Sequence, residues 1–572
     1  MTASLRAELS LPLEVLGMVC DELGHKQDLG ALFNCAVSSK QLAQPAIPLL
    51  YRVYNYSNTE GGDADFSKPQ TFQARKEQQI RTMSKWALLW KSVIRSSIGK
   101  TAYPYAQFLK SLDLRNFTYL LEDTLFRDYG MEDFFAGDMD QFLKAQETPI
   151  RKRTRKGNAI GTRIDIPVVL DLVGESITKY VSVAATKQNS KVALDDIAPG
   201  DISSAVLPRW IGRLSQLRSM TLWDGAVLNE DAATAINTHC PRFNDLTFFR
   251  CSREAADSDL AAFFGALKSD SLESLNALSA EGIGPETLLA LNNHSKSLRR
   301  LKINGLRNDA MKKLSLLQDC LALETLALKD YHGLVNLEAT ENDVFIEVVE
   351  WLKRCQQLKE LSLDRFVSAP EILTQICLNS STQLRKLEVV NSYSLTDSQA
   401  FHRALSQQTT LEALRLTADP EAAFRDDIDT LVSSVCQLSK LTYLDLCVTS
   451  DYFRTAEIRL LATNLKALEV LKFTGYDITD DVWYSISGLH KLRALEIQAV
   501  TSFSADGILS YISTLQPTNQ GLNLLVANQN ADQDISDVEK AIIQDSIAEK
   551  VDGKFEYELF KEAGSEEDSD SD

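Results

Sequence analysis

Leu298-Arg-Arg-Leu301-Lys-Ile303 and Leu323-Glu-Thr-Leu326-Ala-Leu328 share one pattern, Leu-x-x-Leu-x-Leu. Its period of two residues is typical of a β-strand that buries one face. Copies of the pattern, some with conservative apolar replacements, recur between residues 217 and 497 at intervals of 24 to 35 residues. Their first residues, called anchors below, are Leu217, Phe243, Leu272, Leu298, Leu323, Leu358, Leu384, Leu411, Leu441, Leu468 and Leu492. An earlier copy begins at Leu109. Such regularity predicts an array of similar structural units.

Helical stretches are expected between these strands. In residues 396–405, for example, Thr396 and Gln399 have the spacing of a capping box at a helix start. A strand and a helix together in about 26 residues form one coil of an α/β solenoid. In three copies a cysteine also stands three residues before the anchor, at Cys240, Cys320 and Cys355.

These repeats resemble the leucine-rich-repeat family, in its ribonuclease-inhibitor-like and cysteine-containing forms. In those forms a cysteine often ends the helix just before the strand. The resemblance covers residues 205–530. It implies an α/β horseshoe with parallel strands inside and helices outside, and a non-enzymatic binding function.

The outward positions of the strands predict the binding surface, because strand side chains alternate between the two faces. The predicted substrate-binding residues on this concave face are Trp223, Phe249, Arg300, Lys302, Lys329, Glu360, Asp364, Arg415 and Tyr443. Lys386, Glu388 and Asp445 occupy further outward positions. Aromatic residues beside arginine are a favourable composition for a protein interface. The alternative is an ordinary solvated sheet face.

Residues 9–52 have a different pattern and predict a small helical module. Pro12 suits the first turn of a helix, where its missing N–H is not needed. Val15, Leu16, Val19 and Leu23 then fall on one helical face. A second short helix is expected around Leu29 and Leu32, and Pro45 and Pro48 are expected to break the next one.

The module resembles the F-box, which docks a receptor onto the Skp-family adaptor of a cullin-RING ubiquitin ligase. Leu-Pro-x-Glu-Val-Leu at 11–16, Asp28-Leu29 and the closing Leu-Leu-Tyr-Arg at 49–52 carry this resemblance, which is closest to fungal forms. The adaptor-binding residues that it implies are Leu11, Pro12, Val15, Leu16, Val19, Leu23, Leu29 and Leu32. The resemblance implies a substrate receptor of a Skp–cullin–F-box ligase, with an unknown protein substrate. The alternative is a scaffold without a ligase role, whose N-terminal helices only cap the solenoid.

Composition narrows the partners and the compartment. A net charge of −19 disfavours nucleic acid as the main ligand, since phosphates would be repelled. No apolar run is long enough for a membrane span, and we expect neither a signal peptide nor membrane binding. Nine cysteines, an odd number, favour free thiols in the cytoplasm or the nucleus.

The expected organisation has four parts. An F-box-like module at 9–52 precedes a loop and helical connector at 53–104. Leucine-rich repeats follow over 105–530, with an irregular insertion around 115–205 in which a repeat could lie at 168–172. A C-terminal segment at 531–572 ends in a disordered acidic tail, whose serines precede acidic residues. The basic run Arg151–Lys156 is either a nuclear import signal or a solvated loop.

Catalytic chemistry has no clear signature in the sequence. Gly99-Lys-Thr101 lacks the earlier glycine that a phosphate-binding loop requires, because Ile94 occupies that position. No Cys-x-x-Cys pair or zinc-type histidine spacing is found. We therefore expect no enzyme activity, no metal and no cofactor.

Overall fold

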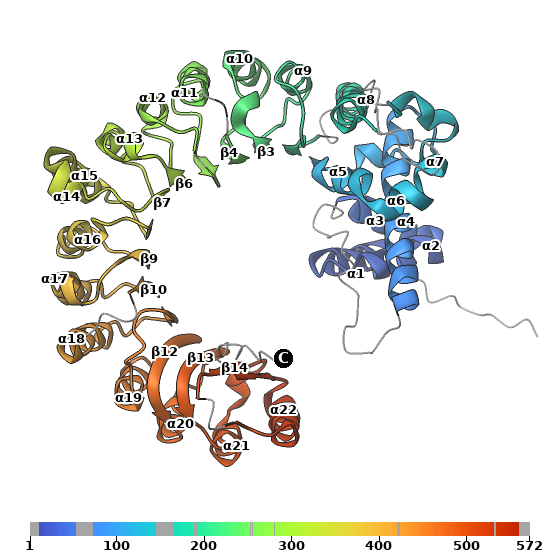
Figure 1. Ribbon diagram of the computed structural model, residues 1–572. Coiled ribbons are helices and arrows are strands. Elements are labelled where there is room, and N and C mark those ends of the chain that lie inside the picture. The colour runs from blue at the N-terminus through green and yellow to red at the C-terminus, as the bar shows by residue number, and fades with distance from the viewer. Residues whose placement is uncertain are drawn as a thin grey trace, which may run out of the picture. The chain divides into compact units, whose positions relative to one another are not determined.

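A computed structural model describes residues 11–52, 72–144, 164–187, 193–251, 253, 255–279, 281–419, 424–530 and 534–559. The basic run Arg151–Lys156 and the acidic tail lie outside these residues. The chain divides into two compact units, 1–272 and 273–572. Fifteen parallel strands alternate with helices in the described residues, which confirms the predicted α/β leucine-rich-repeat solenoid (Figure 1).

The first unit begins with three helices, α1 (Leu13–His25), α2 (Leu29–Ser38) and α3 (Lys40–Arg52). Cys20, Leu32 and Ala46, one from each helix, are fully buried and form their common core. The Asp28 carboxylate accepts a hydrogen bond from the backbone N–H of Ala31 at 2.8 Å and thereby caps α2. The predicted helical module is therefore present.

The expectation that Pro45 and Pro48 break a helix is wrong, because both lie inside α3. Each proline removes one backbone hydrogen bond, a cost that isolated helices rarely tolerate. Here α3 is held by its packing, since Ala43, Ala46 and Tyr51 are buried. Tertiary contacts thus override the local preference.

The connector contains a long helix, α4 (Phe72–Ser97), and the short turn η2 (Tyr105–Gln107) and the first strand, β1 (Ser111–Asp113), follow it. Helices also occupy much of the predicted irregular region, and the expected repeat at 168–172 is wrong because it lies within a helix. These elements are α5 (Arg115–Glu122), α6 (Thr124–Tyr129), α7 (Met131–Phe134), η3 (Gly137–Phe142) and α8 (Ile166–Lys187). Val169, Val173, Ile177 and Val181 are buried along one face of α8, at the spacing of a helix.

The repeat that the insertion contains is β2 (Asp196–Ala198), which pairs with β1 on one side and β3 on the other. Its sequence, Leu194-Asp-Asp-Ile197-Ala-Pro199, fits the first two apolar positions of the pattern but has proline at the third. Proline cannot donate to a strand ladder, which fits the three-residue length of β2. The remaining elements of the first unit are α9 (Val206–Ile211), β3 (Ser219–Asp224), η4 (Gly225–Val227), α10 (Glu230–His239), β4 (Asp245–Arg250) and α11 (Ala256–Ala266).

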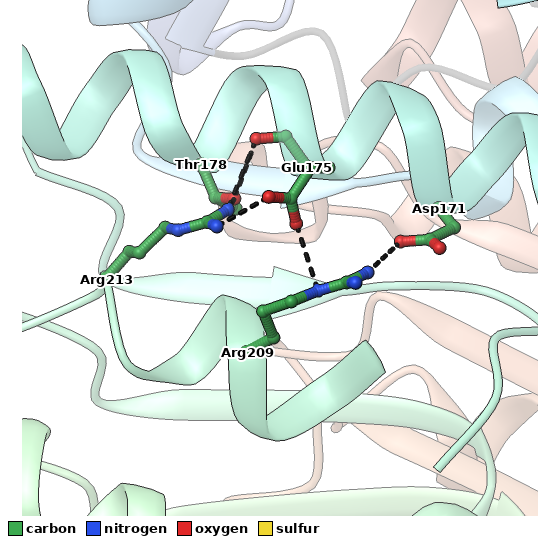
Figure 2. Close-up of polar contacts among 5 residues, drawn as sticks. All are labelled: Asp171, Glu175, Thr178, Arg209 and Arg213. Atoms are coloured by element: carbon green, nitrogen blue, oxygen red, sulfur yellow. Dashed lines mark hydrogen bonds and ion pairs between the residues drawn. The ribbon is translucent and has the colours of Figure 1, made fainter. Parts of the chain in front are cut away.

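Helices α8 and α9 are joined by an ion-pair network (Figure 2). Arg209 reaches Asp171 at 2.7 Å and Glu175 at 3.2 Å. Arg213 binds Glu175 at 2.5 Å and also donates to the hydroxyl of Thr178 at 3.3 Å. The hydrogen bond from Arg213 is the main reason why the pKa of Glu175 lies below its ordinary value. The network fixes the long helix α8 against the repeats that follow it.

The second unit runs from β5 to β15, with strands on one side and helices on the other (Figure 1). Its first elements are β5 (Ser274–Ala277), α12 (Pro285–Ala290), η5 (Leu291–His294), β6 (Arg300–Leu306), α13 (Asn308–Met311), η6 (Leu314–Leu317), β7 (Thr325–Asp330), α14 (Leu337–Thr340), α15 (Asn342–Arg354), β8 (Glu360–Asp364), α16 (Ala369–Cys377), β9 (Lys386–Tyr393), η7 (Thr396–Ser398) and α17 (Gln399–Leu405). The others are β10 (Ala413–Ala418), α18 (Arg425–Val435), β11 (Tyr443–Leu446), α19 (Thr455–Asn464), β12 (Val470–Thr479), α20 (Asp481–Ile486), β13 (Ala494–Ser502), α21 (Ala505–Thr514), η8 (Pro517–Asn519), β14 (Asn523–Asn528), α22 (Asp537–Val551) and β15 (Lys554–Leu559).

The strand register stacks equivalent leucines on neighbouring repeats. Leu301 is level with Leu326, and Leu326 with Leu361. The same level continues through Leu387 and Leu414, and all five side chains are at most 1% exposed. Each repeat therefore buries its apolar strand face against the next repeat, as the sequence pattern predicts.

The predicted capping box at Thr396 and Gln399 is wrong. Helix α17 begins at Gln399 after the N-cap residue Ser398, and Thr396 lies in the preceding 3₁₀ turn. The side-chain amide of Gln399 donates to Asp427 at 2.5 Å instead of reaching back to the helix start. A partner in the next repeat thus replaces the local cap.

The cysteines before the anchors link successive repeats. Cys240 Sγ donates to the backbone oxygen of Leu214 at 3.3 Å, and Cys355 Sγ to that of Cys320 at 3.6 Å. Burial raises the pKa of Cys240, Cys320 and Cys355 to about 12, so these thiols stay protonated. All nine cysteines of the chain are free.

Candidate protein-binding surfaces

The N-terminal module carries a surface of exposed apolar side chains. Five of them belong to α1 or its start, and two to α2. They are Leu11, Leu13, Val15, Met18, Val19, Phe33 and Val37, with exposed fractions between 38% for Val15 and 70% for Met18. We call this set the outer face. Exposed apolar side chains that gather on one surface commonly mark interfaces.

The eight predicted adaptor-binding residues divide into three groups. Four are exposed (Leu11, Pro12, Val15 and Val19), and three are half-buried (Leu16, Leu23 and Leu29). Leu32 is fully buried in the module core.

Helix α1 has two apolar stripes, and the single helical face that the sequence predicts contains residues of both. Cys20 and Leu23 pack in the module core, whereas Val15 and Met18 are exposed and Leu16 is half-buried. Leu13, Met18, Phe33 and Val37 were not predicted. An apolar residue outside the core stripe of a helix is the signal that identifies such positions.

Tyr51 ties the module to the connector. Its side chain is 8% exposed and stacks on Tyr105 at 4.6 Å between ring centroids. Its hydroxyl is 2.6 Å from the hydroxyl of Ser92 in α4. Burial is the main reason why the pKa of Tyr51 is raised to about 12. The module therefore has its own core, and Tyr51 connects it to α4 by a hydrogen bond and to η2 by an aromatic contact.

The outward strand positions of the first unit hold an aromatic pair. Trp223 of β3 and Phe249 of β4 lie with their ring centroids 5.5 Å apart, and Trp223 is 40% exposed. A guanidinium lies near each ring, Arg250 at 5.9 Å from Trp223 and Arg115 at 5.7 Å from Phe249. The structure thus brings together two predicted residues and adds two arginines that were not predicted.

Aspartates hold both arginines in place. Arg250 lies 3.2 Å from Asp224, and Arg115 binds Asp113 at 2.6 Å. The hydrogen bonds that Arg115 donates to Asp113 are the main reason why the pKa of Arg115 is raised. Because each cation is neutralised by its own aspartate, the aromatic pair offers apolar area more than net charge.

In the second unit several predicted residues pair with one another. Lys329 lies 2.6 Å from Asp364 on the next strand. Arg415 lies 3.4 Å from Asp445, to which the hydroxyl of Tyr443 also donates at 3.3 Å. Of these residues Arg415 is exposed, Lys329 and Asp364 are half-buried, and Asp445 is buried.

The charged row on β9 to β13 extends further than predicted. Lys386 pairs with Glu388 at 3.0 Å, and Lys472 pairs with Glu496 at 2.7 Å. Along the row the sign alternates in the order Glu388, Arg415, Asp445, Lys472 and Glu496. By contrast, Arg300, Lys302 and Glu360 of β6 and β8 are exposed. The predicted residues therefore form one aromatic group, one basic group and one self-paired row.

No group of three or more histidine, cysteine, aspartate or glutamate side chains in the described residues could hold a metal ion. No described helix is long and apolar enough to cross a membrane.

No family model and no curated protein matches the chain. Solved structures match at low identity. An internalin (inlF) from Listeria monocytogenes is 15% identical, with a TM-score of 0.31, over 60% of this chain and 93% of its own. A chain of the yeast Rad7 and Elc1 complex is 14% identical, with a TM-score of 0.36, over 63% of this chain and 87% of its own. TLR13, solved with ssRNA13, is 14% identical, with a TM-score of 0.31, over 59% of this chain and 56% of its own.

These likenesses concern the fold alone. The repeat pattern, the parallel register and the stacked leucines described above establish the architecture independently. The described residues form an α/β leucine-rich-repeat solenoid, preceded by the three helices α1 to α3.

Proposed function

We propose that the chain is the substrate-recognition subunit of a Skp–cullin–F-box ubiquitin ligase. In this proposal the outer face of α1 and α2 binds the Skp-family adaptor, and through it a cullin. In each unit the open strand face binds protein substrate, through Trp223 and Phe249 in the first and through residues such as Lys302 in the second. Ubiquitin transfer belongs to other subunits, and this chain contributes proximity between substrate and enzyme. Such a complex would work in the cytoplasm or the nucleus.

The observation that supports this proposal is the outer face. The module already fills its core with Cys20, Leu32 and Ala46, so the outward side chains do not stabilise its fold. Burying large apolar side chains contributes about 25 cal/mol per Å², which these residues forgo in the isolated chain. A partner that covers Val15, Met18 and Val19 would recover that free energy.

Adaptor capture tests the proposal directly. The full-length chain is co-expressed with a Skp-family adaptor and purified by a tag on the chain. We expect the adaptor to co-purify, and the double variant Val15→Asp/Val19→Asp to lose it. Leu88→Asp on α4, where the side chain is 64% exposed, is the matched control and should retain it. Capture that is equal in all three proteins would contradict the docking model. Leu16→Asp is a less direct probe, because Leu16 is half-buried.

A second candidate is a scaffold without a ligase role, whose N-terminal helices cap the solenoid. The joint of Tyr51 with Ser92 and Tyr105 favours it, since a cap must be attached firmly to what it covers. Deleting residues 1–55 separates the two. If the module is only a cap, the deletion should lower the melting temperature sharply. If it is a docking module, the repeats should melt nearly as before while adaptor capture is lost.

A further inference from the structure

The longest interval between anchors, 35 residues from Leu323 to Leu358, contains an unusual loop. Residues 331–336 join β7 to α14 and carry two large apolar side chains outward. Tyr331 is 44% exposed and Leu334 is 73% exposed. We call residues 331–334 the β7 loop. Its exposed apolar side chains lie beside the end of a strand in the proposed substrate face.

Several contacts fix the β7 loop to its neighbours. The backbone N–H of Tyr331 donates to the oxygen of Leu306 at 2.9 Å, and that of His332 to the carboxylate of Asp330 at 3.0 Å. Arg365 of the next repeat donates to the oxygen of Tyr331 at 3.4 Å. The rings of Tyr331 and His332 meet edge to face at 4.7 Å. A loop held in this way exposes its apolar groups without a further ordering cost on binding.

Two exposed cations lie on the neighbouring chain segments, Arg365 directly beside the loop and Lys302 at the level of Ala327, four residues before Tyr331. Lys302 is exposed, and the residues level with it on β7 and β8 are Ala327 and Ser362, neither of which is charged. Arg365 is exposed and follows β8 directly. Lys329 lies between them but is paired with Asp364.

Strands β7 and β8 carry three carboxylates, those of Asp330, Glu360 and Asp364. Asp330 is fully buried, and Asp364 belongs to the pair with Lys329. Glu360 is exposed on β8, two residues before the level of Lys302. In a chain of net charge −19, this stretch therefore presents Arg365 beside an apolar loop and Lys302 four residues earlier along the strands.

We propose that the β7 loop and Lys302 dock an acidic segment of a protein substrate that carries an apolar anchor. The anchor packs against Tyr331 and Leu334, and a carboxylate pairs with Lys302 or Arg365. The docked segment is acidic because most of this chain repels negative charge, whereas the exposed cations at this site attract it. The assignment rests on the proposed substrate role of the open strand face and specifies the class of substrate for it.

Selection from a peptide library tests this site on the full-length chain. Phage-displayed random peptides of about 16 residues, the length of an extended segment that spans several strands, are selected on the wild-type protein. Selected peptides should combine aspartate or glutamate with a large apolar residue. Their affinity should fall about tenfold for Lys302→Glu and for Tyr331→Ala/Leu334→Ala. Lys440→Glu and Tyr484→Ala, at exposed positions elsewhere in the second unit, are the matched controls and should bind normally.

A charge exchange adds a positive result to these losses. A selected peptide with one acidic residue changed to lysine should bind Lys302→Glu better than it binds the wild type. Selection of basic peptides, no selection at all, or wild-type affinity for the Lys302 and loop variants would overturn the site. Adaptor capture is measured on the same variants, which should retain it. A failure of the site therefore leaves the receptor proposal standing, whereas loss of adaptor capture by the wild type would refute the receptor proposal itself.

Discussion

Gly174 of α8 faces the indole ring of Trp210 of α9 so closely that a Cβ at residue 174 would lie 2.1 Å from Cη2 of the ring. Trp210 is fully buried and cannot turn away into solvent. The ion pairs in Figure 2 join the same two helices, so close packing and polar contacts act at one junction. A residue without a side chain is what permits this approach.

Gly174→Ala should therefore destabilise the first unit, although alanine favours a helix by about 1 kcal/mol over glycine. Overpacking a closed site costs typically 1–3 kcal/mol, and here the ring and both helices must shift. Gly265→Ala in α11 is the control, because no atom lies within 4 Å of the Cβ that it would add. Chemical denaturation of the two variants compares them. A Gly174→Ala protein as stable as Gly265→Ala would contradict the packing argument.

A second prediction concerns Gln408, which stands three residues before its anchor, like the cysteines. Its side-chain amide donates to the oxygens of Cys377 at 3.0 Å and Thr382 at 3.1 Å, and its oxygen accepts from the N–H of Leu384 at 2.9 Å. Gln408→Leu would leave these three buried backbone groups unpaired, at about 1–3 kcal/mol for each. We expect a loss of several kcal/mol in the free energy of unfolding.

The neighbouring residue provides the control for Gln408. Gln407 is exposed, and its side-chain amide donates to Ser406 at 3.4 Å. Gln407→Leu should change the free energy of unfolding by less than about 0.5 kcal/mol, as is usual for a surface position. Equal denaturation midpoints for the two variants would show that the bonds of Gln408 do not support the repeat stack.

Gln408 also illustrates what the sequence could predict and what it could not. The period of the leucines predicts strands and their buried face, because every repeat must cover the next with apolar area. The residue three positions before the anchor has no fixed chemistry, since cysteine, glutamine and, at Asn519, asparagine all reach backbone oxygens of an earlier repeat. Only the three-dimensional neighbours identify these residues as equivalent.

The residues of the candidate surfaces could be predicted only in part. Alternation along a strand placed Trp223 and Phe249 outward, and the structure brings their rings together. Arg115 could not be found in this way, because it lies at the start of α5, far away in the sequence. The ion pairs along the charged row could not be predicted either, because they depend on which strands are neighbours and not on the sequence of any single strand.

A third prediction concerns pH. His402 of α17 is fully buried, and burial is the main reason why its pKa is lowered from 6.5 to about 4, with a partial opposing effect of Asp427. Between pH 6.5 and 4 the unfolded chain binds a proton that the folded chain does not bind. The free energy of unfolding should therefore be highest above pH 6.5 and should fall by up to about 3 kcal/mol as the pH drops to 4.

Urea denaturation of the wild type at pH 7 and pH 5 measures this contribution. His402→Leu should reduce the difference in stability between the two pH values, because it removes the titrating group. His490→Gln, which changes an exposed histidine of the same unit, should leave the difference as in the wild type. If His402→Leu retains the full difference, other groups are responsible for the loss in acid.

A final prediction separates the core of the N-terminal module from its outer face. Leu32 is fully buried beside Cys20 and Ala46, so Leu32→Ala leaves a cavity that costs about 2–5 kcal/mol. Val19 is 46% exposed, so Val19→Asp should leave the fold intact while removing apolar contact area from the outer face. Amide hydrogen exchange over residues 13–52 should therefore quicken in Leu32→Ala and stay unchanged in Val19→Asp. Adaptor capture should weaken in both variants, through unfolding in the first and through the lost contact in the second. If Val19→Asp accelerates exchange as strongly as Leu32→Ala, the outer face supports the fold of the module, and the case for a docked adaptor loses its main observation.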